Sequence, residues 1–310
     1  MQSTGRKSGR AAALQDASRP TEAQEIPNVL ECASPLALLY RARHTTSVCA
    51  DSMPIALTIA GSDSSGGAGI QADLKTFAAL GVHGTSAITC ITAQNPHRIS
   101  AIQSCPPEMV RKQIAAVFSE LHPAACKTGM LFSAAIVDIV ADWFAKPNRP
   151  PLVVDPVMIA TSKARLMEPS ALRQMKKRLL PLATLITPNV SEVEVFLRIR
   201  LRSEKDLRKA AMQLYENVGC AALVKGGHLP AAKEAVDWFF DGKQELRLAA
   251  PFLKRGPLHG TGCTYSAAIT ALLAKGEPLS KAVQLAKDFI TRAIAQSEFA
   301  GKYPVLSLQF

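Results

Sequence analysis

The amino-acid sequence predicts an α/β protein with three layers, in which helices cover both faces of a mostly parallel sheet. Three observations indicate this fold class. From Pro54 onward, short apolar segments alternate with segments of helical periodicity. Several of the short segments are apolar throughout, as in strands that are buried on both faces. Turns that carry Gly or Asp follow several of them, as expected where a buried strand leads into a covering helix.

The expected strands and helices follow one another along the chain. Strands are expected at residues 55–60, 85–92, 125–127, 152–154, 185–187 and 222–225. Helices are expected at residues 70–80, 107–121, 133–144, 169–180, 192–197, 203–217, 261–274 and 279–295. Residues 236–240 and 245–249, joined through Asp241 and Gly242, have the pattern of a small β-hairpin near the C-terminal part of the chain.

Apolar residues at helical spacing and capping residues are the signals that predict these helices, as two examples show. Ile70, Leu74 and Phe77 recur at helical spacing, and Gly81 follows them. In the helix at 203–217, Ser203 is the expected N-cap, and Asp206 at the third helical position completes an acidic variant of the capping box. Ligands bind such folds at the carboxyl ends of the strands, so we expect the functional residues in the turns there.

Residues 1–52 differ from the rest of the chain. They mix Ser, Thr, Arg and Pro without sustained periodicity, which predicts a disordered or loosely ordered N-terminal extension before one domain at residues 53–310. A start at Met53 is an alternative, because the first strand begins two residues later. A transit peptide is a third possibility, which four acidic residues oppose: Asp16, Glu22, Glu25 and Glu31.

The charge of the chain favours an anionic ligand. The formal net charge is +11, which suits a nucleotide. Lys and Arg are spread along helix-like segments, and the densest run, residues 175–178, is typical of a solvated helix face. A nucleic-acid footprint is clustered, so no nucleic-acid partner is expected. No segment approaches the roughly 20 apolar residues of a membrane span, so no membrane partner is expected either.

The cysteines favour a cytoplasmic protein. Their number is odd and no Cys-x-x-Cys pair occurs, which favours reduced thiols over disulfides or a zinc site. Most of them are expected to be small buried residues. The seven are Cys32, Cys49, Cys90, Cys105, Cys126, Cys220 and Cys263.

The first strand leads into a glycine-rich turn, residues 61–69, that opens a helix. Such a turn lets backbone N–H groups approach a ligand. A phosphate-binding Walker A loop is excluded, because Gly66 is followed by Gly67 and Ala68 and no Gly-Lys-Ser/Thr occurs. Residues 67–72 fit the dinucleotide fingerprint, but no acidic residue follows between Asp73 and Glu108 to bind a ribose. A glycine-rich connection without any ligand also stays open.

A second glycine-rich turn, residues 258–263, opens the helix at 261–274. Successive N–H groups at a helix N-terminus form an anion hole, and a thiol there, Cys263, is expected to have a lowered pKa. A base beside an anion hole suits phosphoryl transfer to an alcohol, in which positioning and charge stabilisation dominate. The alternative is a helix cap with a buried cysteine.

Polar residues follow three further strands. Asp155 and the segment Thr187-Pro-Asn189-Val-Ser-Glu192 lie at adjacent strand ends, where carboxylates can hold Mg²⁺ through its waters. Simple helix capping by Asn189 and Glu192 is the alternative. Lys225, Gly226 and Gly227 end another strand, and they suit either a nucleotide that lies against the backbone or a plain tight turn.

Taken together, these segments resemble the hydroxymethylpyrimidine/phosphomethylpyrimidine kinases of the ribokinase superfamily. The resemblance covers roughly residues 54–295 in family order. It begins with the long segment at 56–77, which contains Gly61 and Asp73. It continues through Thr92-Ala-Gln94-Asn95, Lys127-Thr-Gly-Met130-Leu, Val154-Asp155-Pro-Val157-Met158, Thr187-Pro-Asn189-x-x-Glu192, Val224-Lys225-Gly-Gly-His228 and His259-Gly-Thr-Gly-Cys263.

The resemblance implies a ribokinase-like α/β/α kinase domain with eight to ten strands, often a homodimer, that uses ATP and Mg²⁺. The implied activity phosphorylates 4-amino-5-hydroxymethyl-2-methylpyrimidine and then its monophosphate, for thiamine synthesis. The implied pyrimidine pocket consists of Gly61, Asp73, Gln94, Met130 and Val157. The implied Mg²⁺ ligands are Asp155 and Glu192, and the implied nucleotide and phosphate side consists of Asp155, Thr187, Asn189, Glu192, Lys225 and Gly227.

The same resemblance implies that Gly260, Thr261 and Gly262 donate N–H groups to the transferring phosphoryl group, and that Cys263 is the base of the first step. Residues 159–163 are implied to form a flap, although Lys163 differs from the expected Gly. A pyridoxal or pyridoxine kinase of the same superfamily is the nearest alternative, which the lack of a flap cysteine opposes. A regulatory protein that keeps the fold is the alternative from another class.

Overall fold

The computed structural model describes residues 52–158, 166–227, 229, 234–253 and 258–309. The expected N-terminal extension, apart from Ser52, and the expected flap at 159–163 lie outside these residues. Within the described ranges, no helix combines the length and the apolar character that crossing a membrane requires.

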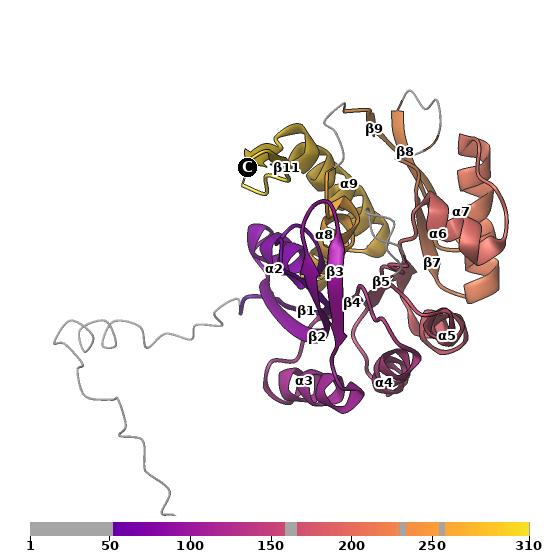
Figure 1. Cartoon of the computed structure of the whole chain (residues 1–310). Helices are drawn as coiled ribbons and strands as arrows, with labels where there is room; N and C mark the ends of the chain where they lie inside the picture. The colour runs from indigo at the N-terminus through magenta and orange to yellow at the C-terminus, as the bar shows by residue number, and fades with distance from the viewer. Residues whose placement is uncertain (1–51, 159–165, 228, 230–233, 254–257, 310) are drawn as a thin grey trace, which may run out of the picture. The chain divides into compact units, whose positions relative to one another are not determined.

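A nine-stranded sheet forms the middle layer, in the order β3-β2-β1-β4-β5-β6-β7-β8-β9 (Figure 1). The six strands β2, β1, β4, β5, β6 and β7 run parallel to one another. The pairs β2–β3, β7–β8 and β8–β9 are antiparallel. Their bounds are β1 Ile55–Asp63, β2 His83–Gln94, β3 Ile99–Ser104, β4 Ala125–Thr128, β5 Leu152–Val154, β6 Leu185–Ile186, β7 Ala221–Lys225, β8 Glu234–Phe240 and β9 Glu245–Pro251.

Helices cover both faces of this sheet. One face carries α2 (Gly69–Ala79), α8 (Thr261–Ala274) and α9 (Leu279–Ala295). The other carries α3 (Pro107–Glu120), α4 (Ala134–Phe144), α5 (Pro169–Gln174), α6 (Val190–Leu197) and α7 (Glu204–Val218). The three-layer α/β fold and the hairpin expected from the sequence are therefore confirmed.

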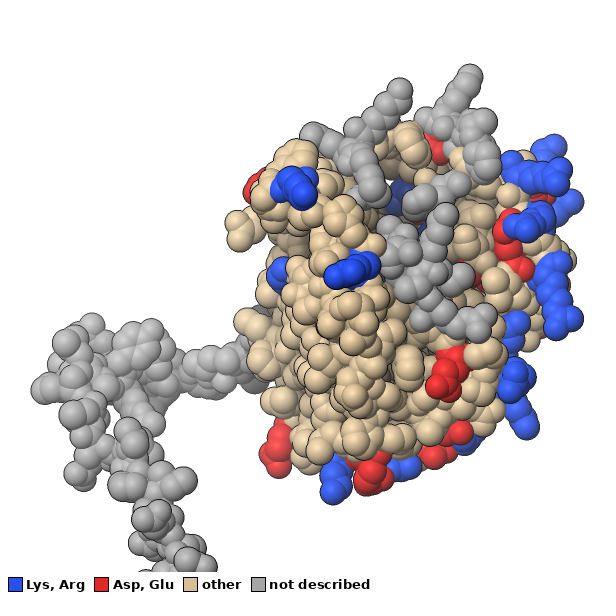
Figure 2. Space-filling model, in the orientation of Figure 1, with Lys and Arg blue, Asp and Glu red and all other residues tan. Residues whose placement is uncertain are grey.

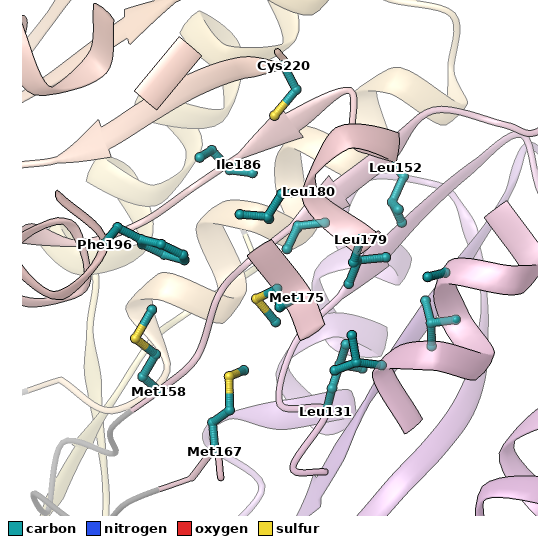
Figure 3. Close-up of a cluster of buried hydrophobic side chains, with 14 of the residues drawn as sticks. Leu131, Leu152, Met158, Met167, Met175, Leu179, Leu180, Ile186, Phe196 and Cys220 are labelled. Carbon is teal, nitrogen blue, oxygen red and sulfur yellow. The ribbon is translucent and has the colours of Figure 1, made fainter. Parts of the chain in front are cut away.

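The largest apolar cluster lies between the sheet and the helices α3 to α7. Figure 3 shows part of it, where Met175, Leu179 and Leu180 extend toward Leu131 and Ile186. The strand side chains that alternate to the other face pack with α8 and α9 in a second cluster. Because strands such as β5 are fully buried on both faces, they contain no polar residue before the turn that ends them.

Three features differ from the sequence-based expectations. The helix expected at 169–180 changes after Gln174 into a π-helical segment, Met175–Leu179, and then a 3₁₀ turn, Leu180–Leu182, that contains Pro181. Strand β3 was not predicted, because none of the residues of this edge strand is buried and they show no apolar pattern. A small two-stranded sheet, β10 (Glu298–Ala300) with β11 (Tyr303–Val305), was also missed.

Basic side chains gather on the side of the domain formed by α7 and the hairpin, with acidic side chains among them (Figure 2). Arg247 pairs there with Glu204 and Glu234 at 2.7 and 2.8 Å, and Arg208 pairs with Glu245. The charges of these two arginines are thus balanced by acidic neighbours at the surface.

Candidate active site

A pocket of about 420 Å³ opens at the carboxyl ends of β1, β4, β5 and β7. It brings together most of the residues that the sequence identified. Those that line it are Gly61, Gln94, Met130, Asp155, Val157, Asn189, Glu192, Lys225, Gly227, Gly260, Thr261, Gly262 and Cys263. Two predicted residues, Asp73 and Thr187, are not in its wall.

The two glycine-rich turns meet at this pocket. Gly260, the N-cap of α8, has φ +82°, and a Cβ on it would collide with the carbonyl oxygen of Gly67. A Cβ on Gly67 would lie 2.7 Å from Cδ2 of the His259 ring. Only glycine permits this approach of the two backbones, so the close contact of the turns explains both glycines without a dinucleotide.

Asp63, the last residue of β1, organises the first turn. Its Oδ1 accepts hydrogen bonds from the backbone N–H and the hydroxyl of Ser65, both at 2.8 Å. Its Oδ2 accepts from the backbone N–H of Ala68 at 2.8 Å and lies 2.9 Å from Nε2 of His259. Burial raises the pKa of Asp63, but the hydrogen bonds from His259, Ser65 and Ala68 outweigh it and lower the pKa to about 2. The turn is therefore built around an ionised carboxylate.

The assignment of Asp73 to the pyrimidine pocket is wrong. Asp73 lies on the buried face of α2, fully enclosed, and both of its carboxylate oxygens are 2.8 Å from Nζ of Lys127. The hydroxyl of Thr58 also donates to Oδ2 of Asp73, at 2.6 Å. Lys127, at the end of β4, lines the pocket in its place. A carboxylate on a buried helix face needs a buried cation, which was the signal for this pair.

Asp155, immediately after β5, forms an ion pair with Lys225 at the pocket. Its Oδ1 lies 3.0 Å from Nζ of Lys225, and its Oδ2 accepts from the hydroxyl of Ser266 at 3.3 Å. A Cβ on Gly262 would lie 3.3 Å from Nζ of Lys225. Lys225 and Asp155 therefore stand beside the N-terminus of α8. Thr187 is buried, with its hydroxyl 3.3 Å from Oδ1 of Asp155, so it supports Asp155 from outside the pocket wall.

Asn189 and Glu192 form a complete capping box at the start of α6. The Asn189 side chain accepts from the Glu192 N–H at 3.0 Å, and Glu192 Oε2 accepts from the Asn189 N–H at 2.8 Å. Both residues also line the pocket, so the capping and the ligand-binding interpretations are compatible. Burial raises the pKa of Glu192 to about 8, with Lys225 opposing and Asp155 adding to the rise.

The expected lowering of the Cys263 pKa is wrong. Burial raises the pKa of this thiol to about 12; Lys127 opposes the rise, while Asp73 and Asp155 add to it. A helix N-terminus lowers a thiol pKa, but here the desolvation of the thiol outweighs that effect. Three other cysteines, Cys90, Cys126 and Cys220, are buried as expected, and every described cysteine is free.

The pocket has two chemically different ends. Near Gly61 it is bounded by an apolar cluster that includes Met130, Leu166 and Val157. The other end runs between the β8–β9 hairpin and α8 and α9, and its walls include Ala250, Phe252, Tyr265, Ile290 and Ile294. The first end suits a small flat ring beside Cys263, and the second suits a larger apolar group.

Sequence reasoning missed the polar anchor of the second end. Asp237, on β8, accepts from Nζ of Lys287 at 2.7 Å and from the backbone N–H of Gly226 at 2.9 Å. A Cβ on Gly226 would collide with the carbonyl of Val236, whereas Gly227 has open space and faces the pocket. An aspartate between Val236 and Trp238 in an apolar strand was the available signal, but its partner lies 50 residues away.

Comparison with known proteins identifies the family. The family model for phosphomethylpyrimidine kinase matches residues 63–306. A hydroxymethylpyrimidine/phosphomethylpyrimidine kinase of Streptomyces coelicolor is 46% identical over 241 residues, which cover 78% of this chain and 88% of that protein. The thiamine biosynthesis bifunctional protein ThiED of Geobacter sulfurreducens is 44% identical over 246 residues, 79% of this chain, but the match spans only 50% of that longer protein.

A solved structure agrees with this result. The pyridoxal kinase of Bacillus subtilis, determined as an ADP complex, superposes with a TM-score of 0.75 at 36% sequence identity, covering 82% of this chain and 97% of that one. Its fold is the one described above. The match of the family model over most of the domain, with relatives named as kinases, shows that this chain is a kinase that belongs to the phosphomethylpyrimidine kinase family.

Proposed function

We propose that this kinase transfers the γ-phosphoryl group of ATP to 4-amino-5-hydroxymethyl-2-methylpyrimidine, and then a second phosphoryl group to the resulting monophosphate, for thiamine synthesis. The observation that carries the proposal is the position of Cys263. Its thiol lies at the N-terminus of α8, in the wall of the pocket that also contains Gln94 and Met130. The names of the relatives support the same substrates.

The residues at the start of α8 suit the transfer itself. The first N–H groups of a helix have no partner within the helix, and those of Gly260, Thr261 and Gly262 border the pocket. They are placed to bind the oxygens of the transferring phosphoryl group, whose charge must be stabilised in the transition state. Lys225, held by Asp155 at 3.0 Å, adds a fixed positive charge beside them.

The thiolate form of Cys263 is proposed to accept the proton of the hydroxymethyl group, becoming the thiol, as the hydroxymethyl oxygen attacks phosphorus. The apolar wall of Met130 and Val157 would hold the methylpyrimidine ring, and Gln94 would hydrogen-bond to its polar edge. The nucleotide would occupy the other end of the pocket, where Gly227 leaves the backbone open and the walls between the hairpin and α9 are apolar.

Asp155 and Glu192 fit a magnesium ion. Mg²⁺ is usually bound through one or two carboxylates together with waters and substrate phosphates, and both carboxylates line the pocket. The described residues contain no cluster of three His, Cys, Asp or Glu that could form an all-protein cage. When bound with ATP, the ion would neutralise charge on the phosphates.

The variants Asp155→Asn and Glu192→Gln should raise the Mg²⁺ concentration needed for half-maximal rate by about 10–100-fold, as loss of a group that orients metal-bound water does. Pyrimidine binding should change little, because neither side chain belongs to the apolar end of the pocket. Titrations of Mg²⁺ against rate, with pyrimidine affinity measured by calorimetry, check this. An unchanged Mg²⁺ dependence would assign both residues a structural role.

An ATP-turnover assay on the purified chain tests the proposed function. Three acceptors are compared: the hydroxymethylpyrimidine, its monophosphate and pyridoxal. We expect turnover with the first two. Turnover with pyridoxal alone would instead favour the activity of the structural relative from Bacillus subtilis. The homodimer, which the family resemblance implies, and the cytoplasmic location, which the cysteines favour, remain predictions.

A further inference from the structure

A chain of hydrogen-bonding groups crosses the pocket at Gln94, the last residue of β2. On one side, Nε2 of Gln94 lies 3.0 Å from Nε2 of His259, which in turn lies 2.9 Å from Oδ2 of Asp63. On the other side, Oε1 of Gln94 lies 3.2 Å from the hydroxyl of Thr92, which lies 2.9 Å from the carbonyl of Ser62. Neither Asp63 nor His259 was identified as a site residue from the sequence.

The donors and acceptors at the His259 end determine which atom of the amide belongs there. The Asp63 carboxylate is ionised, since its pKa is lowered to about 2 by hydrogen bonds that outweigh its burial, and it only accepts. Nε2 of His259 must therefore carry a proton and donate to Asp63. A protonated Nε2 cannot accept from an NH₂ group, so the amide atom beside it must be the oxygen.

The Thr92 end gives the same answer independently. A threonine hydroxyl has one proton, and the carbonyl of Ser62, at 2.9 Å, only accepts. Once this proton is directed to Ser62, the hydroxyl presents lone pairs to Gln94. The amide atom beside Thr92 must then be the nitrogen. A half-turn about the last side-chain bond exchanges the two amide atoms without moving any neighbour.

We propose that His259 and Asp63 fix the amide of Gln94 with its oxygen toward His259 and its nitrogen toward Thr92, and that this orientation makes the pocket select an aminopyrimidine over the corresponding 4-oxopyrimidine. In this arrangement Nε2 of His259 donates to Asp63, one N–H of Gln94 donates to Thr92, and the Thr92 hydroxyl donates to the carbonyl of Ser62. The amide keeps one lone pair and one N–H free for a ligand. His259 is thus a positioning residue for substrate recognition.

The proposal rests on the proposed function, since it places the acceptor's ring against Gln94. A 4-aminopyrimidine edge offers a donor, the amine, next to an acceptor, the ring nitrogen, and this pair complements the free oxygen and N–H of the amide. A 4-oxopyrimidine offers the reverse pattern. To match it, the amide would have to turn, which would set an NH₂ group against the protonated Nε2 of His259.

The test measures the ratio of kcat/KM for the 4-amino and 4-oxo forms of the hydroxymethylpyrimidine. The wild-type chain should prefer the amino form by about 10²-fold or more, because buried polar groups that lose their partners reject the wrong analogue. In His259→Leu, only the Thr92 hydroxyl opposes the half-turn, and it can rotate its proton from Ser62 to the amide oxygen, so the ratio should fall below about tenfold. Both acceptors undergo the same transfer, so any disturbance of the neighbouring anion hole cancels in the ratio.

His259→Gln is the matched control, because its terminal NH₂ can donate to both Asp63 and the Gln94 oxygen. It should retain the wild-type ratio, and thermal melting shows whether each variant is folded. An undiminished ratio in His259→Leu would overturn the proposal. So would an equal loss of selectivity in both variants, which would mean that the ring matters only for its packing against Gly67.

A second measurement does not depend on turnover. Long-range ¹⁵N–¹H spectra of the full chain report the tautomer of each of its six histidines, and loss of one signal in His259→Gln assigns His259. We expect Nε2 to carry a proton at neutral pH. An unprotonated Nε2 would refute the orientation, whereas failure of the wild type to phosphorylate any pyrimidine, with Nε2 protonated, would refute only the proposed function.

Discussion

Replacing Cys263 with alanine or serine should slow phosphorylation of the hydroxymethylpyrimidine by about 10²–10⁴-fold, the usual contribution of a general base, and should leave phosphorylation of its monophosphate near the wild-type rate. The first acceptor is an alcohol that must lose a proton as it attacks. The second is a phosphate oxygen that is already anionic near neutral pH. The N–H groups of the anion hole belong to the backbone and survive both substitutions.

The raised pKa of Cys263 gives this prediction a pH signature. Burial raises that pKa to about 12, so between pH 6.5 and 8.5 the thiolate fraction is small and grows with pH. The rate of the first step should therefore increase over this range in the wild type, and the increase should be absent from Cys263→Ser. Iodoacetamide should label Cys263 slowly at neutral pH, for the same reason.

Separate assays of the two phosphorylation steps test whether Cys263 is the base of the first step. An equal loss in both steps would mean that Cys263 shapes the site without accepting a proton. Full activity of both variants in both steps would leave the residue as part of a helix cap, the alternative that the sequence left open.

Local signals in the sequence predicted most of the fold. The bounds of α8 and α9 and the capping box at Ser203 and Asp206 were predicted as observed, because each depends on residues that are neighbours along the chain. Strand β3 was missed because an exposed edge strand needs no apolar pattern. Structure that depends on residues close together in the sequence can thus be predicted from the sequence alone, even where the segment is short.

Pairings between distant residues could not be predicted in the same way. Asp73 was assigned to the pocket by the family resemblance, yet its partner Lys127 lies 54 residues away on β4. The pKa of Cys263 was expected to follow the helix N-terminus, but it is determined by burial and by the charges of Lys127, Asp73 and Asp155. Three-dimensional packing decides which polar side chain reaches the pocket and which one supports it.

Lys127→Met should destabilise the domain by about 3–5 kcal/mol, the usual cost of removing one partner of a buried ion pair. Both side chains are fully buried, and Nζ of Lys127 lies 2.8 Å from each Asp73 oxygen. The variant leaves a carboxylate in the interior with only the Thr58 hydroxyl as a donor. Urea unfolding followed by circular dichroism measures the loss.

The pH dependence and a double variant distinguish a charge effect from a packing effect. Burial already raises the pKa of Asp73, with Lys127 opposing the rise, and without Lys127 the rise is larger. A group whose pKa is higher in the folded than in the unfolded state stabilises the fold at low pH, and that stability is lost as the pH rises. Lys127→Met should therefore be closest to the wild type near pH 5 and weakest near pH 8. Adding Asp73→Asn should restore most of the lost stability, whereas Arg247→Met, which breaks two exposed ion pairs, should cost little. A Lys127→Met variant that loses the same stability at every pH, and gains nothing from Asp73→Asn, would show that Lys127 contributes through the packing of its methylene chain.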